Sequence, residues 1–227
     1  MGSYEAIVGE EVIKNFKRVI DLNYNPLNSK LKYLCYKNNV EYIGGIEMLI
    51  VQAIKSFEIF NQIKVSEEYI QKILVVVLKQ LNLNIALIGM PLAGKSTICK
   101  KYNGVDIDDE ISKNYKIEDL IKNESEFRKV EAQIIKGNLD KRFICLGGGA
   151  VKTAKNLELL KNHLIIFLDE NLEVLENRYL TKVRPLLKSK EDVSKLYNER
   201  IKLYNNFCNI KFSYSKLEEF LNEYFNN

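Results

Sequence analysis

One segment constrains the fold of this chain more than any other. The apolar run Ile85–Ile88 leads into Gly89-x-x-x-x-Gly94-Lys95-Ser96, and a helical segment follows. Consecutive backbone N–H groups and the positive end of a helix beginning near Lys95 form a nest for phosphate oxygens. A strand, this glycine pattern and a helix in this order predict a phosphate-binding loop in an α/β fold. The alternative is a glycine-rich turn that carries Lys-Ser by chance.

The motif also predicts what individual loop residues bind. Lys95 is expected to reach the β and γ phosphates of ATP, Ser96 to supply a hydroxyl ligand to Mg²⁺, and Thr97 to contact the α phosphate. The ATP-binding residues predicted in this segment are Gly89, Leu92, Ala93, Gly94, Lys95, Ser96 and Thr97.

From Asn84 onward, short β-rich apolar runs alternate with helical segments. This alternation is typical of a parallel sheet covered by helices. We therefore predict one α/β domain over residues 84–227. Its strands are expected at Ile85–Ile88, Val105–Ile107, Phe143–Leu146, Leu164–Leu168 and Ile210–Phe212.

The first 83 residues have a different pattern. They contain one short strand candidate, Val19–Leu22, and a turn at Asn25-Pro26. A helix is predicted over Ile46–Phe60, and another after the N-cap Ser66. We therefore predict a mostly helical N-terminal appendage over residues 1–83, joined to the second domain without a flexible linker.

Composition excludes several classes of function. The net charge of +4 comes from 34 basic and 30 acidic residues spread along the chain, so no nucleic-acid partner is predicted. Four cysteines lie far apart and form no CxxC pair, which favours reduced thiols in a cytoplasmic protein. The longest purely apolar stretch, Ile73–Leu78, is far shorter than the roughly 20 residues of a membrane span, so no membrane partner is predicted.

Residues 84–227 resemble the shikimate kinase family through several motifs in the expected order. The resemblance implies a three-layer α/β/α P-loop fold of the nucleoside monophosphate kinase type with a five-stranded parallel sheet. It also implies transfer of the ATP γ-phosphate to the 3-hydroxyl of shikimate, in aromatic amino acid (chorismate) biosynthesis. The motifs are Asp106-x-Asp108, Glu124-x-x-Phe-Arg128-x-x-Glu131, Gly147-Gly148-Gly149, Arg184-Pro185 with Arg178 upstream, and Arg200-x-x-Leu-Tyr204.

By this resemblance, three side chains and two glycines bind shikimate. Asp108 binds the acceptor hydroxyl and is placed to take its proton, and Gly148 and Gly149 form the floor of the site. Arg128 and Arg200 hold the carboxylate, for which a planar fork of N–H donors is well suited. Two alternatives stay open: Asp108 as one of several acidic residues at a helix N-terminus, and Arg128 in a surface ion pair with a nearby glutamate.

The resemblance also assigns metal and lid residues. Asp106 helps to hold the hydration shell of Mg²⁺, and alternation along a strand would point Asp106 and Asp108 to the same side. Arg184 swings over the triphosphate as a catalytic lid residue, and Arg178 lies at the base of the lid. Leu92 departs from the family pattern, which has a further glycine there. If φ is positive at Leu92, the strain is about 1–2 kcal/mol, and we expect altered ATP affinity.

The first part of the chain, from about residue 6 to 80, resembles the C-terminal end of shikimate dehydrogenase. The motifs are Tyr24-Asn-Pro26 and Met48-Leu-x-x-Gln52, whose tyrosine and glutamine lie near shikimate in that family. A dinucleotide glycine fingerprint and the catalytic Lys and Asp region are absent, so no dehydrogenase activity is predicted. Two origins stay open, a cut from a longer fusion or a natural remnant. Apolar helix faces here favour packing on the kinase, on each other or on a second chain, and a dehydrogenase domain is a further candidate partner.

Two other functions stay open at this point. One is a related P-loop kinase for another small metabolite, such as gluconate or a nucleotide. The other is an inactive nucleotide-binding or scaffolding remnant, suggested by Leu92 and the truncated dehydrogenase part.

Overall fold

The computed structural model describes residues 6–120, 122–180 and 189–225. Within these ranges five strands form one parallel sheet, in the order β4-β5-β3-β6-β7. Each strand coincides with a predicted one, so the predicted P-loop kinase architecture is confirmed. The strands are β3 (Asn84–Gly89), β4 (Val105–Asp106), β5 (Phe143–Cys145), β6 (His163–Leu168) and β7 (Ile210–Phe212).

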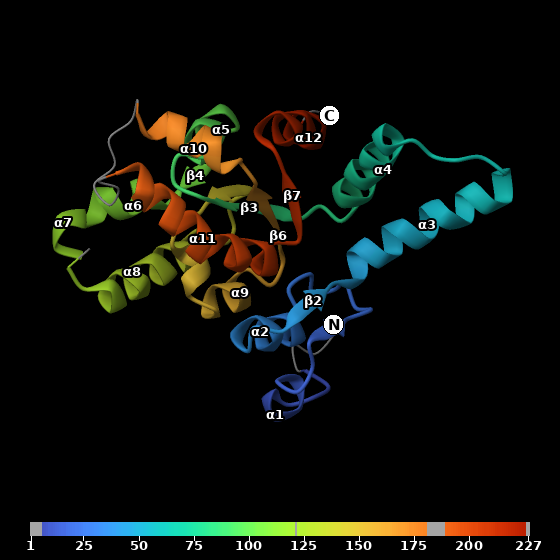
Figure 1. The fold of residues 1–227 in the computed structure, drawn as a ribbon, viewed down its shortest axis with the longest axis horizontal. Helices are drawn as coiled ribbons and strands as arrows, with labels where there is room; N and C mark the ends of the chain where they lie inside the picture. The colour runs from blue at the N-terminus through green and yellow to red at the C-terminus, as the bar shows by residue number, and fades with distance from the viewer. Residues whose placement is uncertain (1–5, 121, 181–188, 226–227) are drawn as a thin grey trace.

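Helices cover both faces of this sheet, as Figure 1 shows, with α5 and α12 on one side and α8, α9 and α11 on the other. The central strands β3 and β6 are buried along almost their whole length, because the layers on both faces exclude water. The helical elements are α5 (Lys95–Lys101), α6 (Ile107–Asn114), α7 (Ile117–Leu120), α8 (Glu124–Gly137), the 3-10 turn η1 (Ala150–Lys152), α9 (Lys155–Leu159), α10 (Leu172–Tyr179), α11 (Lys190–Phe207) and α12 (Tyr214–Phe225).

The helices that carry Arg128 and Arg200 have side-chain caps at their N-termini. The side chain of Asn123 accepts a hydrogen bond from the backbone N–H of Glu126 at the start of α8. A capping box begins α11: Ser189 Oγ accepts from the Asp192 N–H, and the Asp192 carboxylate accepts from the Ser189 N–H. Such caps satisfy backbone donors that the first turn leaves unpaired and fix where the helix begins.

The appendage contains a small sheet as well as helices. Strand β1 (Arg18–Ile20) pairs in parallel with β2 (Glu41–Ile43), a strand that the sequence did not indicate. The two later helices were predicted correctly, and Ser66 caps the second of them by accepting from the Tyr69 N–H. The helices are α1 (Glu10–Ile13), α2 (Lys30–Lys37), α3 (Gly45–Asn61) and α4 (Glu67–Gln80).

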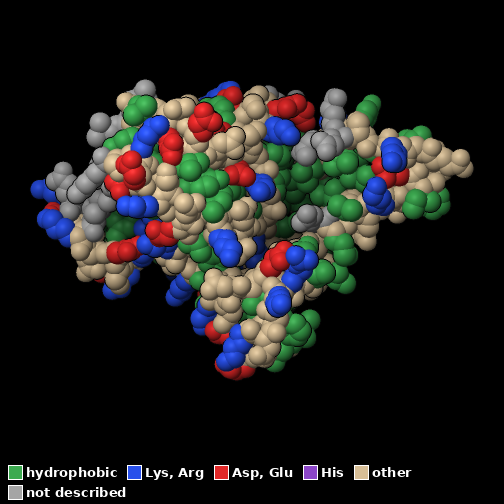
Figure 2. Space-filling view, viewed as in Figure 1, with side chains coloured by type: hydrophobic (Ala, Val, Ile, Leu, Met, Phe, Trp, Pro, Cys, Tyr) green, Lys and Arg blue, Asp and Glu red, His purple; other side chains and the backbone are tan. Residues whose placement is uncertain are grey.

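The appendage and the kinase-like domain share a hydrophobic core. Tyr36, Ile50 and Leu78 belong to the same buried cluster as the residues of the central sheet. Helix α4 lies beside α12, where the Tyr224 hydroxyl donates to the Leu78 carbonyl over 3.4 Å, whereas α3 projects away from the body (Figure 1). Figure 2 shows apolar side chains gathered where the arm formed by α3 and α4 meets the body. The division at residues 83/84 stays a prediction.

No helix in the described ranges is both long and apolar enough to cross a membrane.

Candidate active site

The phosphate loop connects β3 to α5 and is held in shape by its own lysine. Lys95 Nζ donates to the carbonyl oxygens of Gly89 and Met90, over 2.8 and 3.0 Å. Gly94, the N-cap of α5, has φ +107°, a conformation that glycine adopts without a Cβ penalty. Leu92 has φ +69° and its side chain is buried, so the strain expected from a left-handed leucine is present.

Arg178 of α10 supports this loop from outside. Its guanidinium donates to the carbonyl oxygens of Leu92 and Ala93, over 3.0 and 2.6 Å, and pairs with Glu170 over 3.6 Å. The same guanidinium lies 5.8 Å from the centre of the Tyr214 ring. With these carbonyls bound to Arg178, the left-handed turn at Leu92 has compensating contacts.

A second glycine loop, Gly147-Gly148-Gly149, follows β5. A Cβ on Gly147 would lie 2.4 Å from Asp108 Oδ1, and a Cβ on Gly149 would lie 2.2 Å from a terminal guanidinium nitrogen of Arg128. Only glycine permits both close approaches. The loop therefore brings Asp108 and Arg128 together, although one begins α6 and the other lies on α8.

Asp106 and Asp108 were expected to point to the same side because side chains alternate along a strand. That reasoning was wrong. Strand β4 ends at Asp106, and helix α6 begins at the next residue, so strand alternation does not reach Asp108. Asp106 is the N-cap of α6, and its carboxylate accepts from the Asp108 N–H over 3.0 Å. The alternative of an acidic helix N-terminus thus describes the position of Asp108, which also faces the glycine loop.

Arg128 is oriented by a buried carboxylate one turn along α8. Its guanidinium donates to Glu131 Oε2 over 2.7 Å, and Glu131 is 0% exposed. Burial raises the pKa of Glu131 to about 7, and the nearby Arg128 opposes this rise. A surface ion pair, the alternative considered for this motif, does not fit a fully buried carboxylate.

Arg200 reaches the same loop from α11. Its guanidinium donates to the Gly148 carbonyl over 2.9 Å, and the Tyr204 hydroxyl donates to the same oxygen over 2.5 Å. The buried Nε atoms of Arg128 and Arg200 have no hydrogen-bond partner among the described residues. Both ring nitrogens of His163, away from the two loops, are also buried without a partner in the described part of the chain, so the two arginine donors are available to a ligand but do not by themselves require one.

The two loops lie side by side because their strands are neighbours. Leu87 of β3 pairs with Cys145 of β5, and Val105 of β4 pairs with Ile144 of β5. The phosphate loop, the glycine loop and Asp106 therefore meet at the carboxyl ends of three adjacent strands, the usual position of ligands in such sheets. A Cβ on Gly148 would lie 3.0 Å from Pro91, which shows how closely the loops approach.

The residues predicted for Mg²⁺ have suitable chemistry. Ser96 and Asp106 supply hard oxygen donors, and Asp106 ends the strand two places from β3. In the described part of the chain no three His, Cys, Asp or Glu side chains cluster as a metal cage. Mg²⁺ in kinases is held by few protein ligands together with phosphates and water, so this donor set fits the ion.

Some predicted residues are not tested by these contacts. Arg184 lies outside the described residues. Thr97 is exposed in the first turn of α5, and its contact with the α phosphate stays a prediction. The other predicted site residues, from Gly89 to Arg200, lie at or beside the two loops.

Comparison with known proteins identifies the family. The family model described as shikimate kinase matches residues 91–226, which is more than half of the 227 residues. The chain belongs to the shikimate kinase family. A shikimate kinase from Clostridium botulinum (strain Alaska E43 / Type E3) is 38% identical over 135 residues, covering 54% of this chain and 82% of the relative.

Solved structures support the kinase fold. A shikimate kinase from Acinetobacter baumannii in complex with shikimate superposes with a TM-score of 0.55 at 23% identity, covering 62% of this chain and 91% of that one. The shikimate kinase from Bacteroides thetaiotaomicron gives 0.54 at 23% identity, with 62% and 97% covered.

The N-terminal part matches a second family. A shikimate dehydrogenase (NADP(+)) from Clostridium perfringens is 42% identical over 60 residues, which is 26% of this chain and 22% of that protein. The predicted resemblance to shikimate dehydrogenase is confirmed, and the chain spans less than a quarter of that relative.

The sequence indicated no role for two residues that lie against the glycine loop and the phosphate loop. Tyr204 was quoted only as the end of a motif, although its four-residue spacing from Arg200 puts both on one helix face. Tyr214 follows β7, and its ring lies 2.8 Å from where a Cβ of Gly94 would be. Its proximity to the phosphate loop is non-local, so no spacing in the sequence indicates it.

Proposed function

We propose that this chain transfers the γ-phosphate of ATP to the 3-hydroxyl of shikimate, giving shikimate 3-phosphate and ADP for chorismate biosynthesis. The observation that carries the proposal is the meeting of Asp108, Arg128 and Arg200 at the glycine loop beside the phosphate loop. Two guanidinium groups favour an anionic acceptor, because a planar N–H fork binds a carboxylate in two places. The unpaired Nε atoms of both arginines support this assignment.

Asp108 is the catalytic residue for the acceptor. Its carboxylate accepts the hydrogen bond of the shikimate hydroxyl and takes the proton as the oxygen bonds to the γ-phosphorus and the bond from that phosphorus to the bridging oxygen of ADP breaks. Lys95 places positive charge beside the phosphate oxygens, and Arg184, outside the described residues, is proposed to do so from the lid. Phosphoryl transfer has a loose transition state, so positioning and charge stabilisation supply most of the catalysis.

Mg²⁺ is proposed to accompany ATP. Ser96 would hold it directly and Asp106 through water, and the ion when bound would neutralise phosphate charge. We assign ATP binding to the phosphate loop and to Arg178, with a cytoplasmic location for the protein. Residues 1–83 are proposed as the appendage and 84–227 as the kinase domain.

A coupled assay of ADP release tests this function. With ATP and Mg²⁺, ADP release should depend on shikimate and should stay at background with gluconate or a nucleoside monophosphate. Turnover with one of these acceptors and none with shikimate would contradict the proposal. Calorimetric binding of ATP without turnover on any acceptor would instead favour a scaffolding protein.

Substitution of the two arginines tests how the acceptor is held. Arg128→Ala and Arg200→Ala should each raise the KM for shikimate by about 10- to 100-fold, because each removes charged hydrogen bonds to the carboxylate. The KM for ATP should change less than about twofold. Lys129→Ala is the matched control, since it removes an exposed cation from the same helix as Arg128. An unchanged KM for shikimate in both arginine variants would point to another acceptor.

A further inference from the structure

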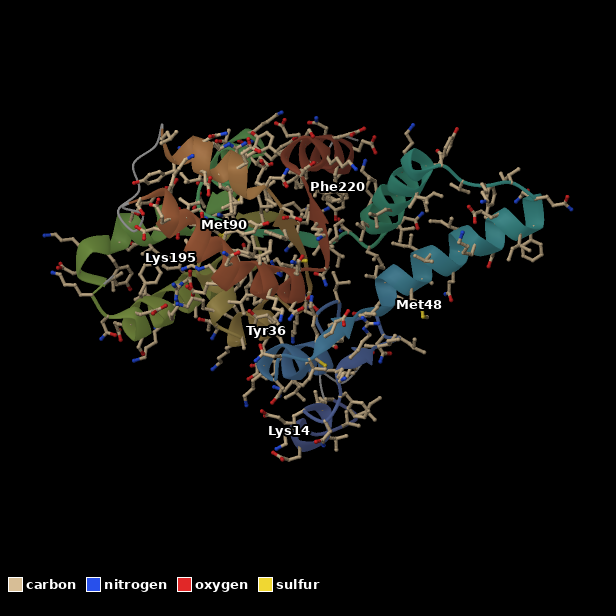
Figure 3. The ribbon with its side chains drawn as sticks, in the orientation of Figure 1. Lys14, Tyr36, Met48, Met90, Lys195 and Phe220 are labelled. Carbon is tan, nitrogen blue, oxygen red and sulfur yellow. The ribbon has the colours of Figure 1, made fainter. Side chains whose placement is uncertain are left out.

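The dehydrogenase-like appendage contacts the kinase domain at η1, which is bonded to the glycine loop, and at the end of α11. Tyr36 of α2 lies at this junction, as Figure 3 shows; its side chain is buried, and its hydroxyl donates to the carbonyl of Val151 in η1. The same ring packs edge-on against Phe207 at the end of α11, with ring centres 5.2 Å apart. One side chain of the appendage therefore contacts two elements of the kinase domain.

Both of those elements are linked to groups that are proposed to bind the acceptor. Turn η1 is hydrogen-bonded to the glycine loop: the Ala150 N–H donates to the Gly147 carbonyl, and the Lys152 N–H to the Gly149 carbonyl, each over 3.0 Å. Helix α11 carries Arg200, which donates to the Gly148 carbonyl. A shift of η1 or α11 would therefore move the loop and the arginine relative to each other.

A buried polar network fixes helix α2 in this position. Asn28, which is 0% exposed, donates through its side-chain amide to the carbonyls of Leu160 and His163, over 2.7 and 2.9 Å. Its amide oxygen accepts from Lys32 Nζ over 2.8 Å, and Lys32 Nζ also donates to the carbonyl of Cys208, the C-cap of α11, over 3.0 Å. Buried networks with satisfied partners specify one arrangement, because any other leaves polar groups unpaired.

We propose that the appendage is part of the machinery that binds shikimate, with Tyr36 as a positioning residue that holds η1 and α11 in register. The inference rests on the proposed function, since it takes Arg128 and Arg200 as the groups that bind the acceptor. It assigns the dehydrogenase-like segment a role in the kinase reaction that requires no dehydrogenase chemistry. The effect is expected mainly on the acceptor, because η1 is bonded to the glycine loop and α11 carries Arg200, whereas the phosphate loop is a separate segment between β3 and α5.

Steady-state kinetics on Tyr36→Phe test the proposal. The variant keeps the ring against Phe207 but leaves the buried Val151 carbonyl without its donor. The KM for shikimate should rise by about three- to tenfold, the usual range for a residue that acts through a packed network, while the KM for ATP stays within about twofold. A structural role alone would lower the melting temperature without separating the two KM values.

Tyr42→Phe is the matched control. It removes another part-buried tyrosine hydroxyl from the appendage, one that bonds Asp21 over 2.9 Å and lies 3.3 Å from Ser29, both within the appendage. Its KM for shikimate should match the unsubstituted protein. Equal KM values for shikimate in Tyr36→Phe and Tyr42→Phe would overturn the inference. The proposed function is tested separately, by Arg128→Ala and Arg200→Ala.

Amide hydrogen exchange on the unsubstituted protein is a second test, and it does not depend on whether a variant folds. Coupling between two sites is reciprocal, so shikimate should slow amide exchange in α2 even though α2 does not touch the ligand. ATP alone should leave the exchange of α2 unchanged. Exchange in α2 that does not respond to shikimate would contradict the proposal.

Discussion

At the scale of single residues, Leu92 shows how a departure from a family pattern is accommodated. Its backbone lies at φ +69°, in the region that glycine adopts most easily, yet its side chain belongs to the buried core. Arg178 binds the carbonyls of Leu92 and Ala93 and so holds the turn. The burial of the leucine side chain offsets part of the strain.

A pair of substitutions separates strain from burial at this position. Leu92→Ala and Leu92→Gly both remove most of the buried side chain, but only glycine relieves the positive φ. The free energy of unfolding, measured in urea, should therefore be about 1 kcal/mol higher for Leu92→Gly than for Leu92→Ala. An alanine variant as stable as the glycine variant would show that the loop stores no strain here.

At the scale of elements, the helix that carries Arg200 depends on its N-terminal capping box. Ser189 and Asp192 satisfy each other's backbone N–H groups at the start of α11. Helix α10 packs against this helix, and Ser194 of α11 donates to Glu176 of α10 over 2.7 Å. The cap therefore fixes the beginning of an element whose far end meets the appendage.

Removing this cap should cost stability more than activity. Ser189→Ala should lower the free energy of unfolding by about 1 kcal/mol, because the Asp192 N–H loses its acceptor. Ser189→Asp keeps an acceptor, so its free energy of unfolding should fall by only a few tenths of the loss in Ser189→Ala. Thermal unfolding of both variants measures the difference. Identical losses for the two variants would mean that the capping box does not stabilise α11.

Local patterns predicted most elements, because apolar periodicity and caps are properties of neighbouring residues. The five sheet strands, α3 and the cap at Ser66 followed from such patterns. Strand β2 did not, because only three residues pair there and their exposure does not alternate. Strand alternation also failed at Asp108, where a helix begins earlier than an apolar run indicates. Contacts between distant elements, such as Tyr36 with Val151, have no signature in the sequence.

At the scale of the whole molecule, the appendage and the kinase domain are joined by a buried amine. Lys32 is 2% exposed, and its Nζ donates to the Asn28 side chain of the appendage and to the Cys208 carbonyl of the kinase domain. Burial lowers the pKa of Lys32 to about 7. Burial also raises the pKa of Cys208 to about 11, so that thiol stays protonated near neutral pH.

The lowered pKa of Lys32 predicts how stability changes with pH. Between about pH 7 and 10.5 the unfolded chain holds a proton on Lys32 that the folded chain has lost, so this residue makes the free energy of unfolding rise with pH. The slope it contributes is at most about 1.4 kcal/mol per pH unit. The free energy of unfolding of the unsubstituted protein minus that of Lys32→Met, measured in urea, should therefore rise from pH 7.5 to 9.5. A difference independent of pH would show that Lys32 stays charged in the folded protein.

The central claim, that this molecule phosphorylates the 3-hydroxyl of shikimate, is tested most directly by the product itself. The protein is incubated with ATP, Mg²⁺ and shikimate, and the product is examined by ¹H–³¹P correlation NMR. We predict one new phosphate monoester whose phosphorus couples to the proton on carbon 3. A phosphate on another hydroxyl, or ADP formed with no phosphorylated shikimate, would contradict the account.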